Sequence, residues 1–257
     1  MVFNKISTTF SDIGIMVRRN LLHYRRLPQL IVFSLIQPIM FLLLFVYVFG
    51  GAIQTGADEY IDYLLPGILV QTILFGAMMT GVGLAQDLSQ GMIDRFRSLP
   101  MARSAVLAGR TISEAARNVL IIVLMTGIGY LIGFRIEHGF LNFTLAMLLS
   151  LLFGFAFSWV SAFIGLAVKN VETAQTAGFI WVFPLAFASS IFVPIDSMKG
   201  WIRTFAEHNP VTYTVNTVRA LSLGIPVGNN FWYALIWIMA ILAVFIPLAV
   251  SRYRKIS

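Results

Sequence analysis

The chain has 257 residues, of which 58% are hydrophobic and only 11% are charged. A soluble domain is nearer half apolar and a quarter charged, so this composition indicates an integral membrane protein with no large soluble domain. The net charge of +7 does not indicate a nucleic-acid partner, because the basic residues flank apolar runs, and the lack of cysteine excludes disulfides and thiolate metal sites.

Residues 1–28 are predicted to form an amphipathic helix that lies in the inner membrane interface. Its apolar side chains recur at helical spacing, at Phe10, Ile13, Val17, Leu21 and Tyr24. Arginines make up the polar side, and Pro28 ends the pattern. This basic amphipathic pattern is typical of interfacial helices. The alternative, a solvated basic tail, is disfavoured by the apolar spacing.

Six apolar runs are long enough, or nearly so, to cross a bilayer as helices. A hydrocarbon core of about 30 Å needs roughly 20 apolar residues. The runs are Leu30–Gly50, Tyr63–Ala85, Asn118–Phe134, Leu141–Val168, Ala174–Pro194 and Phe231–Val250. The third run is short, and its helix is expected to continue backward through Ser113–Arg117. We therefore predict an all-α integral membrane protein with six transmembrane helices, in a single transmembrane domain over residues 1–257.

The distribution of lysine and arginine predicts that both termini are cytoplasmic. Inner segments of multi-pass membrane proteins carry an excess of these residues. With the N-terminus inside, most of the 18 basic residues fall in inner segments. The outer segments then keep Arg135, Lys199, Arg203 and Arg219.

Residues 86–103, QDLSQGMIDRFRSLPMAR, form a charged island between two apolar runs. A short amphipathic helix is expected here, opened by Gly91 and ended by Pro100. Its apolar face comprises Met92, Phe96 and Leu99. The charged residues around that face are Asp94, Arg95 and Arg97. A helix tied at both ends to membrane helices can be gripped and moved by a soluble partner. The alternative is a solvated loop that anchors the inner side of the membrane.

Downstream of the island, Arg110, Glu114 and Arg117 are spaced four and three residues apart. Side chains at these spacings can pair along one face of a helix. We expect such pairs to stiffen the cytoplasmic extension of the third span.

The fourth apolar run carries small residues four positions apart, at Ser150, Gly154, Ser158 and Ala162. Close helix packing is the favoured interpretation, and a direct role in substrate passage is the alternative. Phenylalanine and methionine are abundant, and some of them could line an adaptable apolar route. The sequence does not identify which ones.

Residues 195–230, on the outer side, are too long and too patterned for a plain loop. Asn209 followed by Pro210 is a helix start, because a capping side chain precedes a proline at the first helical position. Gly224 offers a stop for this helix. We predict a short helix that is either re-entrant or lies in the outer interface.

No catalytic constellation is found in the sequence. The histidines, His23, His138 and His208, are far apart and are predicted to lie outside the bilayer. No glycine-rich phosphate loop occurs, so the chain is not expected to bind or hydrolyse ATP by itself. The six runs as drawn contain no Asp, Glu, Lys, Arg or His, which disfavours coupling to an ion gradient.

Several motifs carry a resemblance that covers nearly the whole chain in order. They are IDRFRSLPMAR at residues 93–103, Leu65-Pro66-Gly67, Phe192-Val193-Pro194, Asn209-Pro210-Val211-Thr212 and Arg219-Ala220-Leu221. These motifs resemble the membrane subunit of ABC-2 type exporters, and most closely the daunorubicin-resistance permease group. The resemblance implies six spans, an N-terminal interfacial helix and a short outer re-entrant region, in a permease of the bacterial cell (inner) membrane.

The resemblance also implies partners. Such permeases work as dimers, with an identical or similar second permease copy and two copies of a separate cytoplasmic ABC ATPase. ATP and Mg would be bound by that ATPase, and this chain would bind no cofactor itself. The cargo would be an amphipathic drug or a lipid-like molecule, and the main alternative cargo is a polysaccharide or glycolipid. Two functions of other classes stay open: a gradient-driven carrier and a non-transport membrane scaffold.

Site residues follow from the same resemblance. The island would be the coupling helix seated on the ATPase, through Gly91, Asp94, Arg95, Phe96, Arg97, Leu99 and Pro100. A second, smaller ATPase contact would comprise Lys169, Asn170 and Glu172. The outer segment would be marked by Phe192, Pro194, Asn209 and Pro210. The substrate-binding residues are not identified.

Overall fold

The computed structural model describes residues 14–15, 17, 22, 28–53, 59–92, 103–136, 139–168 and 170–255. Within these residues the chain forms helices and no strand, so the all-α prediction is confirmed for this part of the chain. The interfacial helix predicted over residues 1–28 falls almost entirely outside the described residues, and so does most of the island.

Five described helices are long and apolar enough to cross a bilayer. They are α2 (Pro28–Leu44) with its π-helical continuation η1 (Phe45–Phe49), α3 (Tyr60–Ser89), α5 (Arg103–Ile132), α6 (Gly139–Ala167) and α10 (Asn230–Lys255). The backward extension expected for the third span is confirmed, because α5 begins well before Asn118. Gly133, at φ +128°, follows the end of α5 in a conformation that favours glycine.

The predicted fifth span, 174–194, corresponds to a shorter helix, α7 (Val171–Phe187), which has 17 residues. The predicted end at Pro194 is wrong, because the backbone leaves the helix at Ala188 with ψ 57°. Ser189 Oγ donates to Ala186 O at 2.6 Å and so occupies a carbonyl near the end of the helix. Such local side-chain bonds compete with helix continuation, which apolar composition alone does not reveal.

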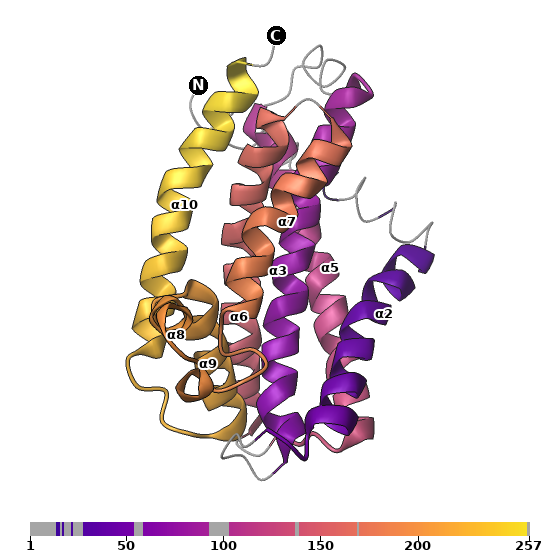
Figure 1. Ribbon diagram of the computed structural model, residues 1–257. Helices are drawn as coiled ribbons and strands as arrows, with labels where there is room; N and C mark the ends of the chain where they lie inside the picture. The colour runs from indigo at the N-terminus through magenta and orange to yellow at the C-terminus, as the bar shows by residue number, and fades with distance from the viewer. Residues whose placement is uncertain are drawn as a thin grey trace.

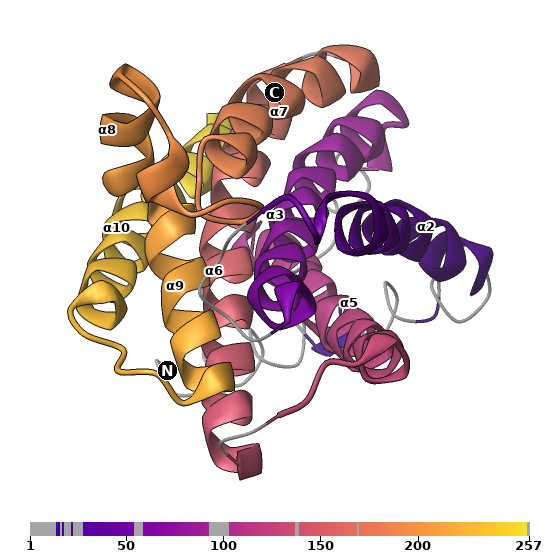
Figure 2. The same cartoon turned by 60° about the horizontal axis from the view of Figure 1, so that its bottom comes forward.

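The central helix is α3, which lies among α2, α5, α6, α7 and α9 (Figures 1 and 2). Of the residues in its most apolar 18-residue window, 83% are buried, compared with 17% for α2 with η1 and 22% for α10. The core of the molecule therefore forms around α3. In Figure 1, α2 tilts away from the other helices towards its N-terminal end.

Small residues let α6 approach α3 closely. A Cβ added to Gly165 would overlap the backbone of Gly81, and one added to Gly81 would overlap the backbone of Ser161. Gly154 faces Ile73 in the same way. This close contact agrees with the packing interpretation of the small residues on the fourth run.

The outer segment folds into η2 (Ile195–Ser197), α8 (Trp201–Glu207) and α9 (Pro210–Leu223). The helix predicted after Asn209 is present: Asn209 Oδ1 accepts from Val211 N at 2.9 Å, and Gly224 follows the last turn at φ +67°. In Figure 1 these short helices lie at one end of the bundle, opposite the end where α3 stops and α5 starts. The outer segment and the flanks of the island are therefore at opposite ends of the molecule.

Candidate functional site

The inner candidate site is described only at its edges. Asp94, Arg95, Phe96, Arg97, Leu99 and Pro100 lie outside the described residues, as does Lys169. Gly91, just after α3, has φ +65°, a conformation that favours glycine, so it can start a new direction for the chain. Asn170 is the N-cap of α7, where its Oδ1 accepts from Thr173 N at 2.7 Å, and Glu172 lies in the first turn.

An ion pair joins the two helices that flank the island. Arg110 Nη1 on α5 donates to Asp87 Oδ2 on α3 at 2.7 Å, and both side chains are partly buried. A Cβ on Gly83 would collide with the Arg110 guanidinium, so this glycine leaves the space that the guanidinium occupies. The prediction for Arg110 was a partner on its own helix, and the structure instead ties it to α3. The ends of α3 and α5 that flank the island are thereby joined.

Glu114 and Arg117 form the pair that the sequence predicts along α5. Arg117 Nε donates to Glu114 Oε1 at 3.0 Å; Glu114 is buried and Arg117 partly buried, and both side chains lie against Gly76 of α3. Arg117 precedes the C-terminal end of α5 by about 22 Å, given the helical rise of about 1.5 Å per residue, which is less than the thickness of a bilayer core of about 30 Å. The apolar helix, Leu107–Ile132, is longer than the third run predicted from the sequence, Asn118–Phe134. Unlike that run, it contains the charged pair of Glu114 and Arg117.

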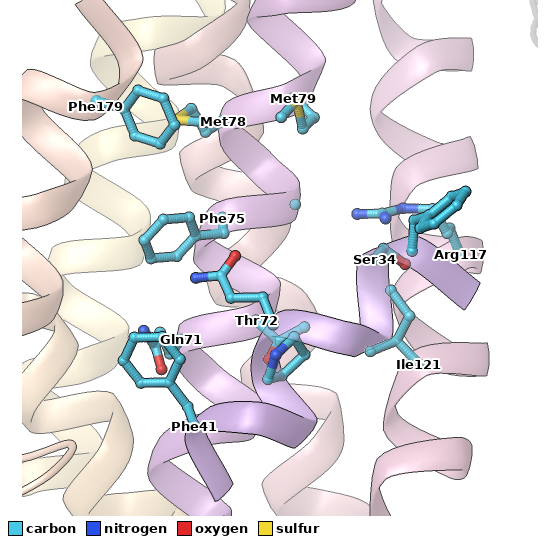
Figure 3. Close-up of a pocket in the computed structure, with 14 residues that line it drawn as sticks. Ser34, Phe41, Gln71, Thr72, Phe75, Met78, Met79, Arg117, Ile121 and Phe179 are labelled. Carbon is cyan, nitrogen blue, oxygen red and sulfur yellow. The ribbon is translucent and has the colours of Figure 1, made fainter. Parts of the chain in front are cut away.

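Beside this pair lies a cavity of about 250 Å³ between α2, α3, α5 and α7. Figure 3 shows its wall, with Gln71, Thr72 and Phe75 on α3, Phe41 on α2 and Arg117 on α5. The polar groups that line it are Ser34, Gln37, Gln71, Thr72 and Arg117, and the remaining lining is apolar and rich in phenylalanine and methionine. Apolar walls with a few polar groups are typical of small-molecule sites.

A row of phenylalanine rings leads from the cavity towards the outer end of the bundle. The rings belong to Phe75, Phe179, Phe183, Phe187, Phe41, Phe192, Phe45 and Phe49, which we call the phenylalanine row. Each of these rings has at least one other ring of the row with its centroid 4.6 to 5.8 Å away, within the usual range for aromatic pairs. Phe183 and Phe187 keep about two fifths of their surface exposed, so the row offers open aromatic surface.

At the end of the bundle that carries α8 and α9, Arg219 is buried and holds the chain that follows α7. Its Nη2 donates to Ser190 O at 2.9 Å and its Nε to Tyr63 O at 3.0 Å. Its Nη1 donates to Asn216 Oδ1 at 3.0 Å, and its Cζ lies 3.5 Å from the centre of the Tyr63 ring. Non-helical backbone at membrane depth is tolerated where protein groups satisfy it, and Arg219 supplies such groups.

Two other predicted residues take part in the same anchoring. Asn209 Nδ2 donates to Leu185 O at 2.8 Å and to Ala188 O at 2.7 Å, in addition to capping α9. Phe192 O accepts from Tyr60 Oη at 2.8 Å. Pro194 is the N-cap of η2, and its carbonyl oxygen accepts from Ser197 N at 3.1 Å and from Ser197 Oγ at 2.6 Å. The outer motifs are therefore structural anchors of the segment after α7.

Sequence reasoning missed the cavity and the role of Arg219. The signal available for the cavity was the presence of Gln37 and Gln71 inside apolar runs. Arg219 appeared only as one of four outer basic residues. Among the described residues, no three His, Cys, Asp or Glu side chains gather into a group that could hold a metal ion.

Comparison with known proteins identifies the family. The family model described as ABC-2 type transporter matches residues 11–223. The daunorubicin resistance ABC transporter permease protein DrrB1 of Streptomyces coeruleorubidus is 34% identical over 240 residues, covering 92% of this chain and 84% of that protein. The probable doxorubicin resistance ABC transporter permease protein DrrC of Mycobacterium tuberculosis is 25% identical, covering 87% and 81%. A putative transport permease, ycf38, of Cyanophora paradoxa is 23% identical, covering 82% and 73%. This multi-pass membrane protein therefore belongs to the ABC-2 type transporter family.

Proposed function

We propose that the chain is the membrane-spanning permease subunit of an ATP-driven exporter that moves an amphipathic drug or lipid-like molecule out of the cytoplasm or inner leaflet. The observation that carries this proposal is the cavity of about 250 Å³, whose lining combines amide, hydroxyl and guanidinium groups with phenylalanine rings. An amphipathic molecule needs both kinds of contact. The names of two relatives, which are drug resistance permeases, agree with this cargo class.

In this proposal the energy comes from a separate ATPase. Members of this family function with a partner ATPase subunit, and we propose two copies of it, which bind ATP and Mg. The chain has six spans, with α7 as the fifth, and both termini are cytoplasmic. The membrane is the bacterial cell (inner) membrane, and the chain itself has no ATPase site.

The coupling route runs from the island to the cavity. The ATPase grips residues 86–103 through Phe96 and the charges at Asp94, Arg95 and Arg97, with Asn170 in a smaller second contact. The ion pair between Asp87 and Arg110 makes the inner ends of α3 and α5 move together. Arg110 and Arg117 are about 10 Å apart along α5, at about 1.5 Å per residue. A tilt of α5 therefore changes the cavity wall that Arg117 forms.

A second permease copy is part of the proposal. The cavity is smaller than the roughly 300–1,000 Å³ of sites for drug-sized ligands. The exposed rings of Phe183 and Phe187 leave aromatic surface beside it. An identical or similar copy facing this surface would enlarge the cavity into a shared route.

The test of the cavity uses the chain reconstituted in liposomes with its ATPase. Phe179→Ala, at a ring that lines the cavity and belongs to the phenylalanine row, should reduce export of an amphipathic fluorescent dye and the dye-stimulated ATPase rate at least severalfold. Phe140→Ala is the matched control, because Phe140 is 79% exposed at the start of α6 and lies outside the cavity and the row. Equal effects of the two substitutions would contradict the assignment of the route.

The test of coupling uses the island. Phe96→Ala and Asp94→Arg should abolish substrate-dependent stimulation of the ATPase while membrane insertion stays normal. Normal export by both variants would contradict the coupling assignment.

A glycan or glycolipid exporter is the second candidate, and the phenylalanine row favours it because aromatic faces also contact sugar rings. Stimulation of the ATPase by a lipid-linked oligosaccharide, and not by the amphipathic dye, would establish this cargo. A gradient-driven carrier would transport in liposomes that contain the chain alone. A scaffold would give no substrate-dependent stimulation with any ATPase partner.

A further inference from the structure

A second hollow lies between α6, α7 and α10, and it runs from α8 to Phe163 and Ile164, close to the end of α6 at Ala167. We call it the outer groove. Its volume of about 890 Å³ is within the range of small-molecule sites. In Figures 1 and 2, α8 lies beside the outer parts of α7 and α10. The outer groove shares no lining residue with the cavity described above.

The walls of the outer groove are braced by aromatic pairs between helices. Phe157 of α6 stacks on Trp181 of α7 with centroids 5.5 Å apart. Phe163 of α6 meets Phe245 of α10 edge to face at 6.0 Å. These contacts hold α6 against α7 and against α10, so they keep the walls of the groove in place.

The polarity of the groove changes along its length. Hydroxyl and imidazole groups occur at the α8 end, where Thr204 and His208 line it. His208 Nδ1 lies 2.9 Å from Thr204 O, and the ring is exposed. Deeper along α6, α7 and α10 the lining is aliphatic and aromatic. The matching occupant has one polar end and a long apolar body.

The length of the groove and its exposed tryptophans point to one acyl chain of a lipid. Trp237 and Phe245, which both line it, are about 12 Å apart along α10 at about 1.5 Å per residue, close to half of a hydrocarbon core of about 30 Å. Trp201 at its mouth is 77% exposed, and Trp232 nearby on α10 is 63% exposed. Exposed tryptophans of membrane proteins gather at headgroup level. An acyl chain whose headgroup lies beside α8 would run from there along the apolar lining.

We propose that the outer groove is a binding site for one acyl chain of a glycerophospholipid of the outer leaflet, with the headgroup region beside Thr204 and His208. The proposal rests on the proposed function only for the orientation that puts α8 on the outer side. The bound chain fills the space between α7 and α10 and supports α8 against the bundle.

The test measures lipid retention by the full chain alone, without ATPase or substrate. Native mass spectrometry after delipidating washes in mild detergent should find about one phospholipid per wild-type chain. Val160→Trp fills the groove from α6 and should lower this retention at least tenfold. Leu152→Trp is the matched control on the same helix, because Leu152 is 38% exposed outside the groove, and it should retain lipid like the wild type. Equal retention by both variants, or no retention by the wild type, overturns the proposal.

A second measurement needs no substitution. Titration of the wild-type chain in detergent with a phospholipid brominated in its acyl chains should quench tryptophan fluorescence and saturate near one lipid per chain, since Trp181 and Trp237 line the groove. Quenching that rises without saturation overturns the site. Either failure leaves the exporter assignment untouched, because that assignment depends on ATPase stimulation and export.

Discussion

Replacing Arg219 with methionine tests whether the outer segment depends on this buried guanidinium. The substitution keeps an unbranched apolar stem of similar length. It removes the hydrogen bonds to Tyr63 O, Ser190 O and Asn216 Oδ1, together with the contact over the Tyr63 ring. We expect the chain after α7 to lose its fixed position while the long helices remain folded.

The magnitude follows from these contacts. Hydrogen bonds to charged groups contribute about 1.5–3 kcal/mol each in soluble proteins, and bonds between side chains of membrane helices average about 0.6 kcal/mol. Two acceptors keep a second donor, because Tyr63 Oη still reaches Ser190 O and Ser190 Oγ still reaches Asn216 Oδ1. Removing a buried charge also removes its desolvation cost. We therefore expect Arg219→Met to lower the free energy of unfolding by about 2–3 kcal/mol.

The assay is equilibrium unfolding in mixed micelles by titration with sodium dodecyl sulfate, followed by tryptophan fluorescence. Arg219→Lys should fall between the wild type and Arg219→Met, because an ammonium cannot reach three acceptors as a planar guanidinium does. Arg203→Met is the control, since the Arg203 guanidinium on α8 bonds two acidic side chains but is solvent-exposed. Exposed pairs contribute little. An equal loss for Arg203→Met and Arg219→Met, or no loss for either, would refute the reasoning.

Three further predictions test the packing, the ion pair and one tertiary bond. Gly81→Ala should destabilise the fold by about 1–3 kcal/mol in the same titration, because the added methyl group overlaps the backbone of α6, whereas Gly127→Ala, with open space around it, should be neutral or slightly stabilising. Asp87→Arg should weaken substrate stimulation of the ATPase, and the double variant with Arg110→Asp should recover part of it; no recovery would argue against a direct pair. Tyr60→Phe should lower the free energy of unfolding by about 1 kcal/mol, and an unchanged midpoint would show that its bond to the chain after α7 is dispensable.

Local chemistry allowed several features to be predicted from the sequence. Asn209, Pro210 and Gly224 mark the ends of α9 because capping and the left-handed turn involve only neighbouring residues. The four-residue spacing that includes Gly154 predicted close packing because one face of a helix repeats at that interval. The pairing of Glu114 with Arg117 follows from the same interval rule.

Other features could not be predicted because they join distant parts of the chain. Arg219 bonds to Tyr63, 156 positions earlier, and nothing near either residue indicates the other. Arg110 was expected to pair along its own helix, but α3 crosses close enough for Asp87 to bond it. The end of α7 was misplaced because apolar composition continues to Pro194 although the backbone turns at Ala188.

The sequence by itself therefore determined that the chain crosses a membrane repeatedly as helices, because bilayer thickness makes length and hydropathy decisive. It also indicated the family, through motifs that are short and continuous. Only the tertiary structure brought Gln71 and Arg117 to one cavity, aligned the phenylalanine row and formed the outer groove. Each of these sites draws its wall from several helices. Their positions depend on how the helices pack against one another, and this packing cannot be predicted from the hydropathy along the chain.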